Sequence, residues 1–418
     1  MTRLRTVLLV CALLFTAAGC ELAAPGRTED QEKVTILGTW TGTQGDQFEK
    51  LLKTFGIPYE YQGTAAQREV LLSEVQAGEP PDIVIMPGVG ELAEYAHRNR
   101  LKELSGLDIY KKSEYGPPWQ PSDGAGSVYW VPLRADLKSI VWHRKDTELP
   151  KSPPSLASWC IGMGDDGPSG WPGSDWIEDL VLQRSGPRAY ERWVRGELKW
   201  TSEPVMGAWL AWGDLLAQDK RAAKAALLAD HRGPDDSNGL LFGKGDCTLE
   251  HQGSFAPFFY GKRAKEATFM DSAELLPGGP YTVEAHEVTG DFAALFSDST
   301  QARKLLGRLA SQSGQQDWVD LARVFSANNK VRPRSGDVEG EVAERLTSPD
   351  TPRCLDASDV MPPAVRDAFY EATLLTLTRY SEGKGRGSVE DILKDVQKVQ
   401  EAQEENPVAR TDVCSTPQ

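Results

Sequence analysis

Short apolar runs alternate with amphipathic segments along the first hundred residues. Residues 33–37 and 83–86 are short apolar runs, which predict buried strands. Residues 44–55, 67–77 and 91–99 place apolar side chains three and four positions apart, which predicts helices with one buried face. Strands and helices that alternate in this way indicate an α/β fold.

Longer helical segments dominate the rest of the chain. Residues 144–175 are rich in proline, glycine and serine, so we expect a loop region there. Trp209 and Trp212 have helical spacing and are interpreted as core residues. The last helix is predicted to start at Ser388, with Asp391 as its capping-box partner. Further strands are predicted at 128–131 and 139–143, and further helices at 208–229 and 301–326.

The amino terminus has the pattern of an export signal. Two arginines precede an apolar run at 7–15, which is too short to span a bilayer. The small residues before Cys20 resemble a lipobox, although alanine stands where leucine is usual. This resemblance implies that residues 1–20 are a lipoprotein signal peptide cleaved before Cys20, so that Cys20 is the lipidated first residue on the outer face of the cell membrane. It also implies that 21–32 form a flexible tether. The alternative is an ordinary secretory signal in which Cys20 is incidental.

Length and composition limit the possible functions. A chain of 418 residues exceeds what one core usually organises and suits two lobes. The formal net charge of −15 repels polyanions, so no nucleic-acid partner is expected. The five histidines are scattered and form no HExxH motif, so no zinc enzyme is expected. No cofactor, metal or catalytic residue is therefore assigned.

The cysteines predict disulfides. Cys11 lies in the signal and Cys20 at the lipid site, which leaves an even number in the exported part of the chain. Such a number predicts two disulfides with three possible pairings, among which sequence alone does not choose. Proximity along the chain favours two of the possible bonds. These are Cys160 with Cys247 and Cys354 with Cys414.

Six ordered segments carry a family resemblance over nearly the whole mature chain. They are AGEPPDIVIMPGVGELAEYA (77–96), VPLRADLKSIVWHRK (131–145), WCIGMGDDGPSGWPGSDWIEDLVLQRSGPRAYERWVRGE (159–197), CTLEHQGSFAPF (247–258), VTGDFAALFSD (288–298) and DASDVMPPAV (356–365). Together they resemble the extracellular solute-binding proteins of carbohydrate ABC importers, particularly the alpha-glucoside-binding branch.

The resemblance implies the type II periplasmic-binding-protein fold, in which hinge strands join two discontinuous α/β lobes around a ligand cleft. The chain is expected to cross between the lobes near 137–142, 286–291 and 330–336. The implied organisation is an N-lobe at 33–138 plus 290–332, a C-lobe at 139–289 plus 333–405, and a tail at 406–418.

A sugar site needs aromatic rings for the apolar faces of the sugar and charged groups for its hydroxyls. Trp171 and Asp175 offer both within a segment shaped by glycine and proline. We interpret Trp171 as a ligand residue, with a structural loop anchor as the alternative. Asp175 is either a ligand residue or a helix cap. Trp176 fits the face of the following helix and is assigned to the core.

Two further groups of candidates come from predicted strands, where α/β sheets place ligands. Trp40 and Thr41 follow the first strand. Asp46 lies where the family often has an acid, although an acid also suits the start of a helix. Lys138 is a charged residue within an apolar crossing strand, so it must find an acceptor or reach water, and the resemblance places it near the cleft. Arg134 has a similar claim.

The remaining candidates depend on the resemblance. Phe255 lies where relatives carry an aromatic ring that stacks on the sugar. Asp291 lies at the second crossing and either binds the ligand or clamps the hinge. Tyr370 follows a phenylalanine where relatives have a tryptophan, and this departure leaves the identity of the sugar open.

The implied function is binding, without enzymatic activity. A monomeric, lipid-anchored chain would capture an oligosaccharide such as an alpha-glucoside and deliver it to ABC permease subunits by lobe closure. One alternative is a sensor or scaffold on the same fold, and another is an importer for peptides, polyamines or metals. A glycoside hydrolase is a third, because such enzymes use paired carboxylates. Its candidate acids are Asp165, Asp166, Asp175, Glu178 and Asp179.

Overall fold

The computed structural model describes residues 33–104, 114–116, 118–119, 126–150, 153–234, 239–282, 285–333, 336–348, 350–403 and 413–415. The predicted signal peptide, the lipid site at Cys20, the tether and most of the tail lie outside these residues. In the described part of the chain, no helix combines the length and the apolar character that crossing a membrane requires.

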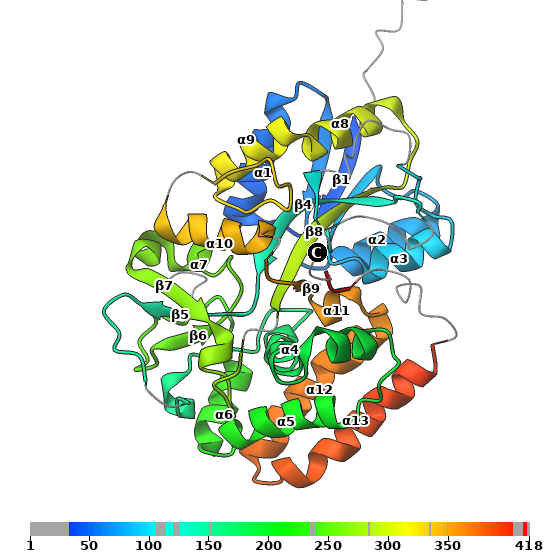
Figure 1. Ribbon diagram of the computed structural model, residues 1–418. Coiled ribbons are helices and arrows are strands. Elements are labelled where there is room, and N and C mark those ends of the chain that lie inside the picture. The colour runs from blue at the N-terminus through cyan, green and yellow to red at the C-terminus, as the bar shows by residue number, and fades with distance from the viewer. Residues whose placement is uncertain are drawn as a thin grey trace, which may run out of the picture. The chain divides into compact units, whose positions relative to one another are not determined.

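The described strands form two sheets (Figure 1). The six-stranded sheet contains β1 (Val34–Gly38), β2 (Tyr59–Gly63), β3 (Ile83–Pro87), β4 (Trp130–Leu137), β8 (His286–Leu295) and β9 (Arg353–Leu355). Its order is β2-β1-β3-β8-β4, and β9 pairs with the start of β8. The three-stranded sheet has the order β6-β5-β7, formed by β5 (Ile140–Arg144), β6 (Leu249–His251) and β7 (Ala267–Asp271).

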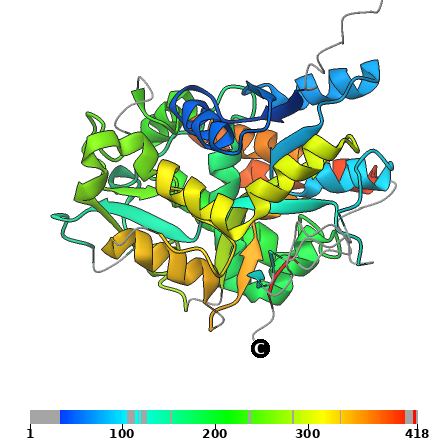
Figure 2. The ribbon, with the colours of Figure 1, turned by 90° about the horizontal axis from the view of Figure 1, so that it is seen from above.

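Alternate residues of β3 pack on opposite faces of the larger sheet. Ile83 and Ile85 join the core formed with α1 (Gly42–Thr54), α8 (Thr300–Ala310) and α9 (Gln312–Ala322). Val84 and Met86 join the other core, which includes side chains of α2 (Gln67–Ala77) and α3 (Gly90–His97). Figures 1 and 2 show α1 beside α9. The two-residue period of a strand therefore explains the continuous apolar run in the sequence.

A second group of helices packs around an aromatic core. Trp209 and Trp212 are completely buried there, so their assignment to the core is confirmed. The helices in mutual contact are α4 (Trp171–Val194, interrupted at Gly186), α5 (Glu203–Leu216), α6 (Lys220–Leu228), α12 (Pro363–Ser381) and α13 (Gly385–Glu401). The remaining elements are α7 (Pro257–Tyr260), α10 (Asp337–Thr347), α11 (Ala357–Val360) and the 3-10 turns at Leu156–Ser158, Gly261–Glu266 and Ser272–Glu274.

Several predicted helix boundaries are wrong, two of them because a polar cap starts a new helix inside a periodic segment. The segment 208–229 is two helices, since the Asp219 side chain accepts hydrogen bonds from backbone N–H groups and starts α6. Ser311 likewise caps α9 and divides the segment 301–326. The last helix begins at Gly385, and the Ser388 hydroxyl donates to the Gly385 carbonyl, so the predicted capping box does not form.

Two disulfides join distant parts of the chain. Cys160 is bonded to Cys247 and Cys354 to Cys414, which are the bonds that proximity along the sequence favours. The second holds residues 413–415 against β9, where Leu355 N–H donates to Val413 and Ser415 N–H donates to Arg353. This end of the chain is therefore fixed to the larger sheet.

We expect removal of the second disulfide to destabilise the fold. The bond closes a segment of 60 residues. Because it restricts the unfolded chain, replacing both cysteines by serine should lower the free energy of unfolding by about 2–4 kcal/mol. Urea unfolding with intact-mass confirmation of the remaining disulfide measures the change. An unchanged midpoint and slope would contradict the expectation.

Glu250 on β6 is a buried carboxyl in an environment that favours its neutral form. Its Oε2 accepts hydrogen bonds from Leu241 N–H at 2.8 Å and the Tyr260 hydroxyl at 3.1 Å. Burial nevertheless raises the pKa of Glu250 to about 8, from an ordinary value of 4.5. Between these two values the folded chain binds a proton that the unfolded chain has lost.

Stability should therefore fall as the pH rises through this interval. For Glu250 alone we expect a loss on the order of 4 kcal/mol between about pH 5 and about pH 9. Glu250→Gln removes the titrating group, so its free energy of unfolding should depend less on pH than that of the wild type. Urea unfolding across the range tests this, and identical pH profiles for both proteins would disprove it.

Candidate functional site

A cleft of about 590 Å³ is lined by residues near both sheets. One part of its wall comes from the start of α1 and the end of α9, including Trp40 and Trp318. Another part comes from the segment that follows β6, including Phe255 and Phe258. Arg134 and Asp136 of β4 contribute charged groups between these aromatic walls. The cleft thus combines apolar rings with paired charges.

Trp40 follows β1, and its position is fixed by aromatic contacts. Its ring centroid lies 4.8 Å from Phe48 and 5.3 Å from Trp318. The Tyr61 hydroxyl donates a hydrogen bond to the Trp40 carbonyl at 2.8 Å. Only 3% of Trp40 is exposed, so it is a core residue with one edge at the cleft.

Arg134, Asp136 and Asp291 form a buried charged group beside Trp40. Arg134 Nε lies 2.8 Å from Asp136 Oδ2 and 3.8 Å from Asp291 Oδ2. Burial raises the pKa of Asp291 to about 6, although Arg134 and a hydrogen bond from Trp40 lower it. β4 and β8 bring these residues together, because Arg134 and Asp291 are directly paired in the sheet. Ser254 also donates to Asp136 at 2.8 Å.

Lys138 anchors a second buried charged group. Its Nζ lies 2.6 Å from Asp175 Oδ2 and 3.5 Å from Asp356 Oδ2. Burial lowers the pKa of Lys138, but the carboxylates, Asp175 first, more than offset burial and hold the pKa well above its ordinary value. Burial raises the pKa of Asp175 to about 6 despite the opposing effect of Lys138. Asp175 is therefore an ion-pair partner, and its carboxylate makes no helix cap.

Phe255 links the two charged groups. Its ring centroid lies 6.0 Å from the Arg134 guanidinium carbon and 5.6 Å from Lys138 Nζ, which are cation–π distances. The Trp171 ring lies 6.0 Å away and contacts Lys138 Nζ at 4.7 Å. A single aromatic side chain at the cleft is thus supported by two buried cations and a second ring.

Trp171 occupies a different setting from the predicted loop. It is the first residue of α4, directly after Gly170, whose φ of 105° suits glycine. The Trp171 indole donates to Asp165 Oδ2 at 2.7 Å, and its ring lies 4.8 Å from His231. These contacts hold Trp171 in the structure, so they support the loop-anchor interpretation as well as a ligand role.

The predicted candidates divide into those at the cleft and those elsewhere. Trp40 and Phe255 line it, whereas Thr41 and Asp46 are exposed and are not part of its wall. Tyr370 is half-buried, and its hydroxyl donates to the Ser358 hydroxyl at 3.3 Å. The ligand roles therefore remain predictions for all the candidates. The full set is Trp40, Thr41, Asp46, Lys138, Trp171, Asp175, Phe255, Asp291 and Tyr370.

Sequence reasoning missed several important residues. Asp136 follows Arg134 by two positions on the same strand, so the alternation of a strand would have placed both on one face. Trp318 has the helical spacing of a core residue and nothing in the sequence marks it as a cleft residue. Asp356 lies in a recognised block, but its contact with Lys138 joins positions more than 200 residues apart.

The fold is the two-lobed α/β fold of solute-binding proteins. Solved structures share this architecture. A chitin oligosaccharide binding protein aligns with a TM-score of 0.66 and 18% identity, over 88% of this chain and 98% of that chain. RafE from Streptococcus pneumoniae aligns with a TM-score of 0.63 and 16% identity, over 88% and 98%. The predicted fold class is confirmed.

Sequence relatives are named as solute-binding proteins. The chain is 28% identical over 394 residues to the alpha-glucosides-binding periplasmic protein AglE of Rhizobium meliloti, covering 83% of this chain and 84% of AglE. It is 27% identical to the osmoprotective compounds-binding protein GgtB of Synechocystis, covering 86% and 91%. No protein-family model matches the chain. The predicted resemblance to the solute-binding proteins of carbohydrate ABC importers is confirmed.

Proposed function

We propose that this chain is the substrate-binding component of an ABC importer and captures an oligosaccharide of the alpha-glucoside class. The cleft carries the proposal, because its aromatic residues suit the apolar faces of a sugar ring. Arg134 and Asp136 can make charge-assisted hydrogen bonds with sugar hydroxyls. The name of AglE supports the choice of ligand class.

Delivery to the permease would follow from lobe closure. A ligand that touches both walls of the cleft stabilises the closed form by its differential affinity, and the permease recognises that form. The lobe boundaries predicted from the sequence remain part of this proposal. So do a monomeric state and attachment to the membrane through lipid on Cys20. The names of the relatives, which describe periplasmic and extracellular binding proteins, support a location outside the cytoplasmic membrane.

Catalysis has less support than binding. Glu178 and Asp179 are completely buried, and Asp179 Oδ2 lies 2.8 Å from His251 Nε2. Asp175 is engaged with Lys138. These acids are not among the residues that line the cleft, so they are poorly placed to flank a glycosidic bond. We therefore propose a protein without enzymatic activity.

A thermal-shift screen tests the proposed ligand class. The mature protein is melted with maltooligosaccharides, single sugars, amino acids and polyamines. A ligand that binds only the folded state raises the melting temperature by mass action. We expect a rise with an alpha-glucoside and recovery of that sugar intact after incubation. A rise with polyamines alone would contradict the ligand class, and release of glucose would contradict the absence of catalysis.

A further inference from the structure

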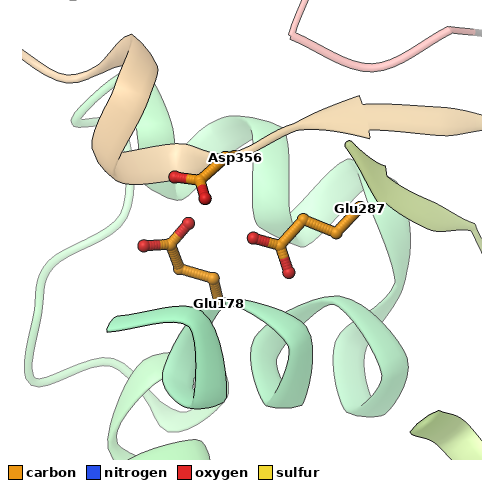
Figure 3. Close-up of side chains that lie close together, drawn as sticks. All are labelled: Glu178, Glu287 and Asp356. Atoms are coloured by element: carbon orange, nitrogen blue, oxygen red, sulfur yellow. The ribbon is translucent and has the colours of Figure 1, made fainter. Parts of the chain in front are cut away.

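Three carboxylates from distant segments meet in the interior (Figure 3). Glu178 comes from α4, Glu287 from β8, and Asp356 from the residue before α11. Each offers a carboxylate oxygen within 4.8 Å of the others. All three residues are buried, and Figure 3 shows their carboxyl groups converging. These residues lie outside the wall of the ligand cleft.

Glu287 is the unusual member of this cluster. Among the described residues, no N–H or hydroxyl group donates a hydrogen bond to either of its carboxylate oxygens, although the residue is 0% exposed. Glu178 Oε1 also lacks a partner there, whereas its Oε2 accepts from Ala357 N–H at 2.7 Å. An isolated buried carboxylate is costly, so three such oxygens require a compensating ligand or protons.

Nearby cations are already engaged with other acids. Lys138 forms its shorter contact with Asp175 and lies 3.5 Å from Asp356. His251 is paired with Asp179. The strongest electrostatic neighbours of Glu287 are themselves acids, beginning with Glu178 and Asp356. The unpartnered oxygens therefore face further carboxyl groups.

We propose that Glu178, Glu287 and Asp356 bind a hard divalent cation, with Ca²⁺ as the better match. Ca²⁺ prefers oxygen ligands at about 2.3–2.6 Å, so oxygens on opposite sides of the ion are about 4.6–5.2 Å apart. The ligand oxygens of the cluster all lie within 4.8 Å of one another, which is close enough for one Ca²⁺ ion to bind all three carboxylates. Mg²⁺ has the same ligand preference but requires shorter distances, so it should bind more weakly here.

The ion would act on structure and would not touch the sugar. Glu287 lies where β8 pairs with β9, and its backbone carbonyl accepts from Lys138 N–H at 2.8 Å. A cation at this point would connect α4 to the strands at a predicted crossing between the lobes. It would therefore stabilise the junction of segments that are distant in the sequence, whatever ligand the cleft binds.

Metal analysis and thermal unfolding test the proposal. The mature protein is unfolded and refolded with chelator, then mixed with CaCl₂ or MgCl₂ at about 1 mM and freed of excess ion by gel filtration. We expect one bound Ca²⁺ per chain and a melting temperature about 5 °C higher than in chelator. Glu287→Gln should abolish both effects. Glu250→Gln changes a buried carboxyl outside the cluster and should retain them.

Two results would overturn the proposal. One is wild-type protein that binds neither ion and melts at the same temperature in chelator and in CaCl₂. This would mean that protons neutralise the cluster. The other is Glu287→Gln protein that still binds one Ca²⁺. If that variant does not fold, Glu178→Gln provides the same test, because the glutamine oxygen can still accept from Ala357 N–H.

Discussion

Replacing Phe255 by alanine should weaken sugar binding about 30-fold. The Phe255 ring lines the cleft and lies within cation–π distance of both Arg134 and Lys138. Its removal takes away an aromatic surface for the sugar and leaves the two cations less well shielded. Losing an aromatic anchor of this kind costs about 2 kcal/mol, which corresponds to the expected change in Kd. Isothermal titration with the sugar found by the thermal-shift screen measures it.

Two variants make this result specific. Phe55→Ala removes a partly buried phenylalanine at the end of α1, away from the cleft wall, and should leave Kd unchanged. Phe255→Tyr retains the ring and should retain most of the affinity. If Phe255→Ala binds the sugar as tightly as the wild type, the sugar does not stack on the Phe255 ring.

Lys138→Met should produce the largest loss of stability, about 3–5 kcal/mol. Methionine has a similar length but leaves Asp175 and Asp356 without the ammonium group that lies 2.6 and 3.5 Å from them. An uncompensated buried carboxylate must then be desolvated or protonated when the chain folds. Urea unfolding at neutral pH measures the difference in free energy.

The partner residue provides the control. The double variant Lys138→Met with Asp175→Asn removes both charges of the shorter ion pair and should recover a substantial part of the loss. Lys394→Met removes an exposed lysine that pairs with Glu390, so it should change stability by less than about 0.5 kcal/mol. Equal losses in the free energy of unfolding for Lys138→Met and Lys394→Met would show that the buried ion pairs of Lys138 contribute no more than an exposed ion pair.

Local signals in the sequence predict the presence of helices and strands better than they predict where one helix ends and the next begins. The helix predicted at 67–77 has these boundaries in the structure, because Gly78 ends it in the left-handed conformation. The first strand, predicted at 33–37, lies one residue later, at Val34–Gly38. By contrast, Asp219 starts a new helix inside a segment whose apolar periodicity continues across the break. A polar cap within a periodic segment is easily interpreted as a solvent-facing residue.

The sequence indicates which types of residue form the candidate site better than it indicates which of these residues contact one another. Trp40 was identified by its position after a predicted strand and Phe255 by the family resemblance, and both line the cleft. Periodicity does not show that Lys138 meets Asp175 and Asp356, because those contacts depend on how α4 and the chain before α11 pack. Trp171 illustrates the same limit, since its neighbours include His231, which lies 60 positions later.

The position of β8 has a consequence for the order of folding. β3 and β4 do not pair with each other, because β8 lies between them and bonds to both. A nascent chain that has emerged only as far as β7 therefore has two open strand edges and no partner for either. Such long-range pairing delays folding. β3 and β4 therefore cannot be joined through β8 until residues 286–295 have emerged, which places assembly of the larger sheet late in synthesis.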